Sequence, residues 1–188
     1  CAAIVFEPVQ GEGGFVPAPI EWVKAVRKIC DEHGILMICD EVQCGWARSG
    51  KMFASQYFAE AGAAPDIMST AKSIAGGLPL SAVTARAEIM DAVPGGTIGG
   101  TYGANAVSAA SALKVVEVME RDDYPAKAMH IADVATKAFN EWKEKYECVG
   151  DVRGLGAMIG IEFVKDKATK EPDAALVNAI VQEAMNNG

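Results

Sequence analysis

The chain has 188 residues, of which 51% are hydrophobic and 22% are charged, and its formal net charge is −8. This composition predicts a globular chain with a substantial buried core and excludes intrinsic disorder. Negative charge without a Lys/Arg cluster argues against nucleic-acid binding, and no apolar run is long enough to cross a bilayer. Five cysteines without CxxC or Cys/His spacing argue against a metal site or disulfide framework and favour a reducing cytoplasm.

Strand and helix patterns alternate over the first two thirds of the chain. The run from Ile35 to Cys39 is apolar without interruption, which is typical of a strand covered on both faces. The predicted elements are strands at residues 2–6, 35–39, 66–70 and 80–85 and a helix at residues 20–33 that Gly34 ends. This order predicts an α/β fold, in which a mostly parallel sheet has helices on both faces and binds ligands at its strand ends.

Long helices replace this alternation near residue 122. We predict helices at residues 104–121, 124–146 and 172–185 and one strand at residues 157–163. A domain boundary is therefore expected there, with residues 1–122 forming the C-terminal part of a large α/β domain and residues 123–188 the start of a small α+β domain. Because the chain enters a strand directly after Cys1 and ends just after a helical pattern, we interpret it as part of a longer protein.

A carboxylate and an amine follow two of the predicted strands. Asp40 comes directly after the run from Ile35 to Cys39, and Lys72 follows the strand at residues 66–70. Small residues around Lys72 predict a packed backbone that would desolvate the amine and make it a nucleophile. Such a pair suits pyridoxal phosphate, because an amine forms a Schiff base with the cofactor aldehyde and a carboxylate keeps the pyridine nitrogen protonated. Taken singly, Asp40 also fits a turn residue and Lys72 a surface lysine.

Five sequence blocks occur in an order and at spacings that resemble the class III (omega-amino-acid) aminotransferases, among them the 4-aminobutyrate aminotransferases. The resemblance implies the fold-type I architecture of pyridoxal phosphate enzymes. One stretch departs from the family, which often has Gly-x-Gly-Arg-Thr-Gly where this chain has Gly-Trp-Ala-Arg-Ser-Gly at residues 45–50. The five blocks are residues 7–14, 40–43, 71–77, 99–102 and 152–156.

The resemblance implies a set of cofactor-binding residues. Lys72 would form the Schiff base with pyridoxal 5'-phosphate and move the proton between substrate and cofactor carbons. Asp40 would pair with the pyridinium nitrogen, Gln43 would lie near the phenolic oxygen, and Val42 would press on one face of the ring. Thr101 would donate to the cofactor phosphate of a partner subunit, which implies a homodimer with shared sites. Without the other blocks, Thr101 would fit an ordinary Gly-rich turn.

The resemblance also implies how substrates are bound. Arg153 would bind the substrate carboxylate, and Glu12 would pair with Arg153 when the donor lacks an alpha-carboxylate and swing away when 2-oxoglutarate or glutamate binds. A solvated loop carboxylate and a surface ion pair are the structural alternatives for these two residues. The implied reaction passes the amino group of an omega-amino acid such as 4-aminobutyrate to 2-oxoglutarate, giving the semialdehyde and glutamate.

Several alternatives remain open at this point. Within the same family, the chain resembles 5-aminovalerate, ornithine and acetylornithine aminotransferases, and a racemase or decarboxylase can use the same scaffold. The second hypothesis is a non-catalytic piece, because the family places another phosphate-binding loop, a ring-stacking aromatic and another substrate-binding arginine in an N-terminal half that precedes these blocks.

Overall fold

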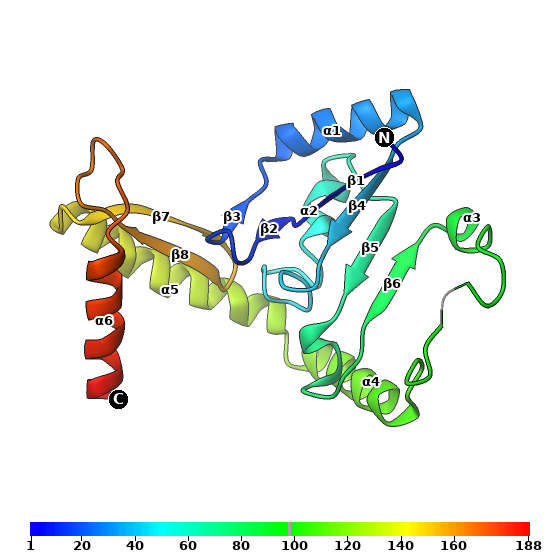
Figure 1. Cartoon of the computed structure of the whole chain (residues 1–188). Coiled ribbons are helices and arrows are strands. Elements are labelled where there is room, and N and C mark those ends of the chain that lie inside the picture. The colour runs from blue at the N-terminus through cyan, green and yellow to red at the C-terminus, as the bar shows by residue number, and fades with distance from the viewer. Residues whose placement is uncertain (98) are drawn as a thin grey trace.

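A four-stranded sheet forms the first part of the chain in the computed structural model, which describes residues 1–97 and 99–188 (Figure 1). The strand order is β1-β4-β5-β6; β1, β4 and β5 run parallel, and β6 is antiparallel to β5. The predicted α/β fold with a mostly parallel sheet is confirmed, and the carboxyl ends of the three parallel strands share one edge. The strands are β1 (Ala3–Phe6), β4 (Leu36–Asp40), β5 (Ile67–Thr70) and β6 (Ala82–Ala85).

Two helices cover one face of this sheet. Helix α1 (Ile20–His33) ends at Gly34 in the left-handed conformation, as predicted, and α2 (Ser55–Glu60) lies beside it. Their apolar side chains, with Ala63 just after α2, pack with the alternate β4 residues in one cluster: Val23, Val26, Cys30, Met37, Cys39, Phe58 and Ala63. On the opposite face Val5 and Val83 are 62% and 57% exposed. Among the described residues, helices cover one face of the sheet, so the prediction of helices on both faces is confirmed for that face only. An apolar run shows that both faces of a strand can be buried, but it does not show which segment covers each face.

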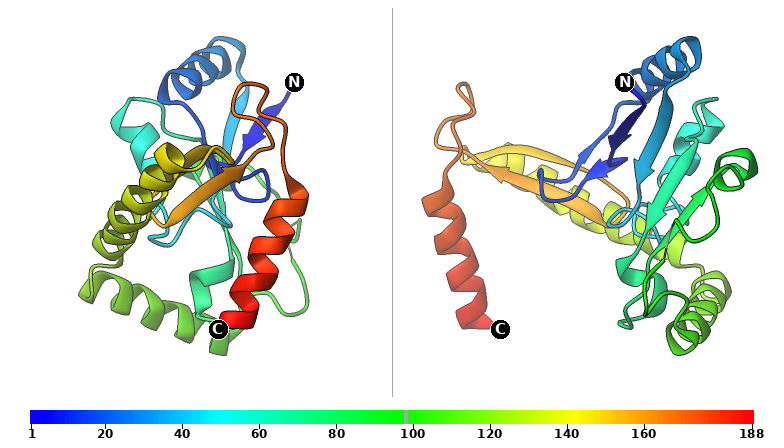
Figure 2. Two further views of the ribbon diagram at one scale, coloured as in Figure 1. Left: turned by 90° about the vertical axis from the view of Figure 1, so that its left-hand side faces the viewer. Right: turned by 45° about the vertical axis from the view of Figure 1, so that its right-hand side comes forward.

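A helix pair and a hairpin make up the second part. Helices α4 (Ala106–Arg121) and α5 (Tyr124–Lys145) are joined by two residues, where we predict the domain boundary, and that boundary stays a prediction. The hairpin of β7 (Val149–Leu155) and β8 (Met158–Phe163) packs on α5. Helix α6 (Ala174–Asn187) stands away from the sheet (Figure 2). None of the described helices is long and apolar enough to cross a membrane.

Short elements connect the sheet to the hairpin. A small antiparallel ribbon, β2 (Val9–Gln10) with β3 (Val16–Pro17), lies between them, and β3 contacts β7 (Figure 1). A second apolar cluster joins the same parts and contains Val9, Cys44, Ala54 and Met158, with Phe15 and Leu155 packed against it. The edge of the sheet where Asp40 lies is thus tied to the second part of the chain. The remaining short elements are the 3₁₀ helix η1 (Lys72–Ala75) and α3 (Ala87–Met90).

Candidate active site

Lys72 lies just past the carboxyl end of β5 and begins η1. Its backbone is left-handed, with φ of 49°, a conformation that costs a non-glycine residue about 1–2 kcal/mol. Backbone strain of this kind concentrates at functional sites. The lysine side chain is exposed, so the expectation that its neighbourhood would desolvate it is wrong for the described chain. Ile74 and Ala75, which follow it, take the buried positions of this turn.

Asp40 is the last residue of β4 and pairs in register with Ser69 of β5. Its Oδ1 atom accepts hydrogen bonds from the Val42 N–H at 2.9 Å and from the Ser69 hydroxyl at 3.2 Å. Its Oδ2 atom has no hydrogen-bond partner among the described residues. Because side chains alternate along a strand, Asp40 shares the open face of the sheet with Val5 and Val83. The carboxylate is therefore fixed by one oxygen and available through the other.

Lys72 lines a cavity of about 340 Å³ together with three polar side chains, Glu12, Gln43 and Arg48. The Gln43 amide donates to Glu12 Oε1 at 3.5 Å. A Cβ atom at Gly11 would overlap the Gln43 amide, so this side chain lies directly against the backbone of the loop that carries Glu12. The structure thus brings together three of the predicted site residues, Lys72, Gln43 and Glu12.

Arg48 was not among the residues predicted from the sequence. Its guanidinium is exposed, lines the Lys72 cavity and donates to the Ser73 hydroxyl at 3.4 Å. Two cations, Arg48 and Lys72, thus face one carboxylate, Glu12, which gives the cavity a net positive charge suited to anionic groups. The available signal was an arginine in the glycine-flanked stretch at residues 45–50, shortly after Asp40.

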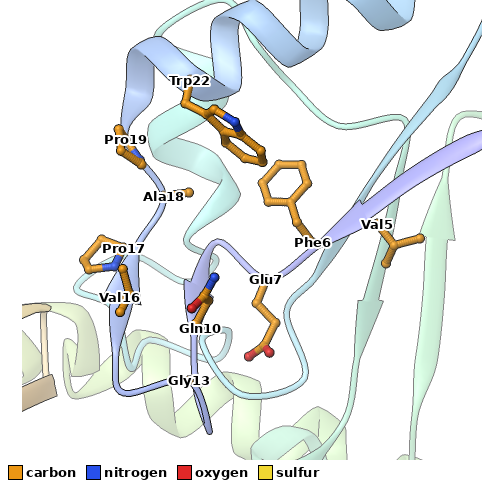
Figure 3. A pocket seen from close by; sticks show the side chains of 10 residues that line it. All are labelled: Val5, Phe6, Glu7, Gln10, Gly13, Val16, Pro17, Ala18, Pro19 and Trp22. Atoms are coloured by element: carbon orange, nitrogen blue, oxygen red, sulfur yellow. The ribbon is translucent and has the colours of Figure 1, made fainter. Parts of the chain in front are cut away.

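A second hollow lies on the other side of the Glu12 loop. This groove of about 540 Å³ runs along β1 and the start of α1, where Phe6 and Trp22 pack edge to face with ring centroids 5.0 Å apart (Figure 3). Glu7 points from it toward the loop, where its carboxylate accepts a hydrogen bond from the Gly11 N–H at 2.8 Å. Because it has neither Lys72 nor another cationic side chain among its lining residues, we do not take this larger groove as the active site.

The expected ion pair between Glu12 and Arg153 is not formed. Arg153 Nη1 instead contacts Glu162 at 2.7 Å and Asp151 at 3.1 Å, and its Nε–H donates to the Gly14 carbonyl at 2.8 Å. Burial lowers the pKa of Arg153, but its hydrogen bonds to Glu162 and Asp151 and their charges outweigh this effect and raise it. The two carboxylates lie on the same hairpin as Arg153 and are therefore its nearer partners.

Val42 and Thr101 occupy different surroundings. Val42 is half-buried, and its N–H is one of the two donors to Asp40. Thr101 is exposed in the turn that precedes α4 and does not line the Lys72 cavity. The chain therefore does not bring Thr101 to its own Lys72.

The thiols near Asp40 are unsuited to nucleophilic chemistry. Burial, with a smaller contribution from the Glu41 charge, raises the pKa of Cys39 to about 12. Burial and the Glu41 charge also raise the pKa of the Cys44 thiol. Among the described residues, no group of three or more His, Cys, Asp or Glu side chains could hold a metal ion. Lys72, in contrast to these buried thiols, is exposed.

Comparison with known proteins agrees with this geometry. Residues 1–188 match the family described as aminotransferase class-III. The chain belongs to the class-III aminotransferase family. Within this family it is 48% identical to the 5-aminovalerate aminotransferase DavT of Pseudomonas putida and 47% identical to the 4-aminobutyrate aminotransferase GabT of Escherichia coli. Each match spans 187 residues, 100% of this chain and 43% of the relative, so the chain spans less than half the length of these curated relatives.

The class-III fold is also seen in solved structures. The PLP-bound amine transaminase of an uncultivated Pseudomonas species matches with a TM-score of 0.84 and 37% identity. This match covers 91% of our chain and 40% of the transaminase. The sheet edge that carries Asp40 and Lys72 therefore belongs to a fold that binds pyridoxal phosphate in that transaminase.

Proposed function

We propose that the protein containing this chain is a pyridoxal 5'-phosphate-dependent aminotransferase. It takes the amino group of 4-aminobutyrate or a close homologue, passes it to 2-oxoglutarate, and releases the semialdehyde and glutamate. The observation that carries this proposal is the position of Lys72, which lies strained and exposed at the end of β5 in a cavity shared with Gln43 and Glu12. The relatives named for 4-aminobutyrate and 5-aminovalerate support this donor class.

The residues present fit the cofactor. Bound here, pyridoxal phosphate would supply an aldehyde that carries the amino group and a ring that accepts electrons. Lys72 would hold the cofactor through Nζ and afterwards move a proton with the same atom. The free Oδ2 atom of Asp40 is suited to a protonated ring nitrogen, because Ser69 and Val42 already hold Oδ1.

The other predicted residues have proposed roles of their own. Val42 would contact a face of the ring, and Gln43 would hydrogen-bond near the phenolic oxygen. Glu12, 3.5 Å from the Gln43 amide, would face the substrate. Arg153 would bind the substrate carboxylate, and Asp151 and Glu162, which its Nη1 atom contacts, would orient its guanidinium.

We propose that the active protein is a homodimer with shared sites. Thr101 is exposed and lies outside the Lys72 cavity of its own chain, which suits a hydroxyl that binds the cofactor phosphate of a partner subunit. A cytoplasmic location is proposed because all five cysteines are free.

The donor is tested by steady-state kinetics of the protein that contains this chain. We expect 4-aminobutyrate or 5-aminovalerate to be the best donor and 2-oxoglutarate to be an acceptor, with glutamate formed in equal amount to the semialdehyde. Faster turnover of ornithine or acetylornithine would show that this amine, and not 4-aminobutyrate or 5-aminovalerate, is the donor. Inversion of an amino acid without any need for an acceptor would instead favour the racemase alternative.

The 188-residue chain alone tests the non-catalytic alternative. Each form, the chain alone and the longer protein, is mixed with pyridoxal phosphate and its visible absorbance is recorded. A cofactor band in the longer protein but not in the chain alone would show that this part needs the rest of the protein to form a site.

A further inference from the structure

Glu41 is a fully buried carboxylate next to Asp40, and no role has been given to it so far. Because side chains alternate along an extended chain, Asp40 lies on the open face of the sheet and Glu41 on the face covered by helices. Glu41 Oε1 accepts from the Ser55 N–H at 2.5 Å, and Oε2 accepts from the Ala54 N–H at 3.0 Å. The Cys44 thiol also donates to Oε2, at 3.3 Å. Among the described residues Glu41 forms no ion pair, so its carboxylate is held by the backbone at the start of α2.

The backbone of Glu41 connects this anchor to Asp40. The Glu41 N–H donates to the Ser69 carbonyl at 2.9 Å, and the Glu41 carbonyl accepts from the Gly45 N–H at 3.0 Å. The peptide group that joins Glu41 to Val42 donates at its other end, where the Val42 N–H reaches Asp40 Oδ1 at 2.9 Å. A peptide group is planar, so its carbonyl and its N–H turn together. The orientation of this one peptide therefore decides whether Asp40 keeps its backbone hydrogen bond.

We propose that Glu41 is a positioning residue that orients Asp40 for the cofactor. Its buried carboxylate anchors the Glu41–Val42 peptide to the start of α2, and this peptide holds Asp40 Oδ1. Glu41 itself lies on the other face of the sheet and acts only through Asp40. An apolar side chain at position 41 would fill the same space, but it would leave the buried N–H groups of Ala54 and Ser55 without an acceptor.

The first test measures hydrogen exchange of the Val42 amide in the protein that contains this chain, without added cofactor. Glu41→Gln keeps the shape of the side chain, but its NH₂ group cannot accept a hydrogen bond from a backbone N–H. We expect the Val42 amide to exchange roughly 10-fold faster, because the peptide loses part of its anchor and opens more often. Unchanged exchange of this amide in Glu41→Gln would overturn the proposal.

Asp66→Asn is the matched control for this test. Asp66 is also a buried carboxylate that accepts from a backbone N–H, that of Met37 at 2.7 Å, but it lies directly before β5, at the opposite end of the strand from Lys72. We expect this variant to lower the free energy of unfolding and to leave exchange of the Val42 amide unchanged. An equal rise in both variants would show that a general loss of stability frees the peptide, and it would overturn the proposal.

A second variant covers the case in which Glu41→Gln does not fold. Gly45→Ala leaves the Glu41 side chain intact, but a Cβ atom at this position would lie only 2.7 Å from the Glu41 carbonyl oxygen. The added methyl group should therefore turn the Glu41–Val42 peptide, and we expect the same faster exchange of the Val42 amide. Normal exchange in Gly45→Ala would contradict the claim that this peptide controls the contact to Asp40.

The cofactor test rests on the proposed function and uses a double-mutant cycle, with binding of pyridoxal phosphate followed by visible absorbance. We expect Glu41→Gln to weaken binding roughly 10-fold in the wild-type background and to have little further effect in Asp40→Ala, because Glu41 acts through Asp40. Asp66→Asn should bind the cofactor as the wild type does. Losses that multiply independently at positions 40 and 41 would contradict the proposal.

The pH dependence of the cofactor band gives a readout that a loss of stability alone would not change. The midpoint should shift in Glu41→Gln and stay in place in Asp66→Asn, because the Asp40 charge acts on the ring nitrogen. An unchanged midpoint in Glu41→Gln would count against the proposal. If the wild-type protein shows no cofactor band, the proposed function fails, whereas the exchange experiment still decides whether Glu41 holds the contact between Val42 and Asp40.

Discussion

Asp40 and Ser69 are register partners on the parallel strands β4 and β5, and the Ser69 hydroxyl donates to Asp40 Oδ1 across 3.2 Å. This contact joins the strand that ends in the carboxylate to the strand that leads to Lys72. Together with the Val42 N–H, it holds one carboxylate oxygen and leaves the other available. The relative position of carboxylate and amine is thus set by the sheet itself.

Ser69→Ala should weaken cofactor binding without unfolding the protein. The variant removes one of the two hydrogen bonds that orient Asp40, a change of about 1 kcal/mol or roughly fivefold in an equilibrium constant. Titration with pyridoxal phosphate, followed by visible absorbance, measures the change. Ser69→Thr keeps the hydroxyl and should restore affinity, so equal weakening in both variants would show that the hydroxyl is not the cause.

Ala47→Gly should be better tolerated than the same substitution at Ala54. Both side chains are buried, 2% and 1% exposed, so each loses the same methyl group. Ala47, however, is left-handed, with φ of 68°, whereas Ala54 has φ of −63°. Relief of the left-handed strain should make Ala47→Gly less costly by about 1–2 kcal/mol. Urea unfolding of the two variants compares them directly, and equal losses would contradict the assignment of strain to this loop.

Asp66, directly before β5, connects α1, β4 and Arg86, which follows β6. Its Oδ2 atom accepts from the Met37 N–H at 2.7 Å and from Arg27 at 2.8 Å, and Oδ1 contacts Arg86 at 3.2 Å. Burial raises the pKa of Asp66, but the hydrogen bonds from Met37 and Arg27 and the charges of both arginines outweigh burial and lower it. A carboxylate with a lowered folded pKa stabilises the fold above its unfolded pKa, and this stability is lost as pH falls through the folded value.

Asp66→Asn should therefore destabilise the protein most at neutral pH. We expect a loss of about 3–5 kcal/mol at pH 7, because a buried partner of Arg27 is removed. The difference from wild type should begin to shrink as pH falls below about 4, the unfolded pKa of an aspartate, and should vanish only below the lowered folded pKa of Asp66. Unfolding free energies measured from pH 7 down to about pH 2 follow this loss. Asp31→Asn is the control, because Asp31 also pairs with Arg27 but is 67% exposed, so its loss should stay within about 1 kcal/mol.

The parts of the fold that the sequence predicts are those with a long, consistent pattern. The run from Ile35 to Cys39 and the helical stripe before Gly34 each give the element found, within one residue at the ends. Strand β7 was missed because Val149–Leu155 mixes two glycines with Asp151 and Arg153, so no apolar alternation is visible. Helix α2 was missed because its six residues are too few for a periodic signal.

In the candidate site, too, some features could be predicted from the sequence and others could not. The positions of Asp40 and Lys72 follow from strand ends, since the ends of parallel strands meet at one edge. The partners of Glu12 and Arg153 depend on distances between separate elements, which a sequence does not contain. Arg153 meets Glu162 because β7 and β8 form a hairpin, and β7 was not predicted.

The most direct test of the central claim is to find which side chain carries the cofactor. The protein that contains this chain is incubated with pyridoxal phosphate, reduced with borohydride and digested, and the labelled peptide is identified by mass. We predict the label on Lys72, its loss in Lys72→Ala, and its retention in Lys51→Ala. A label on another lysine, or labelling that persists in Lys72→Ala, would contradict the account.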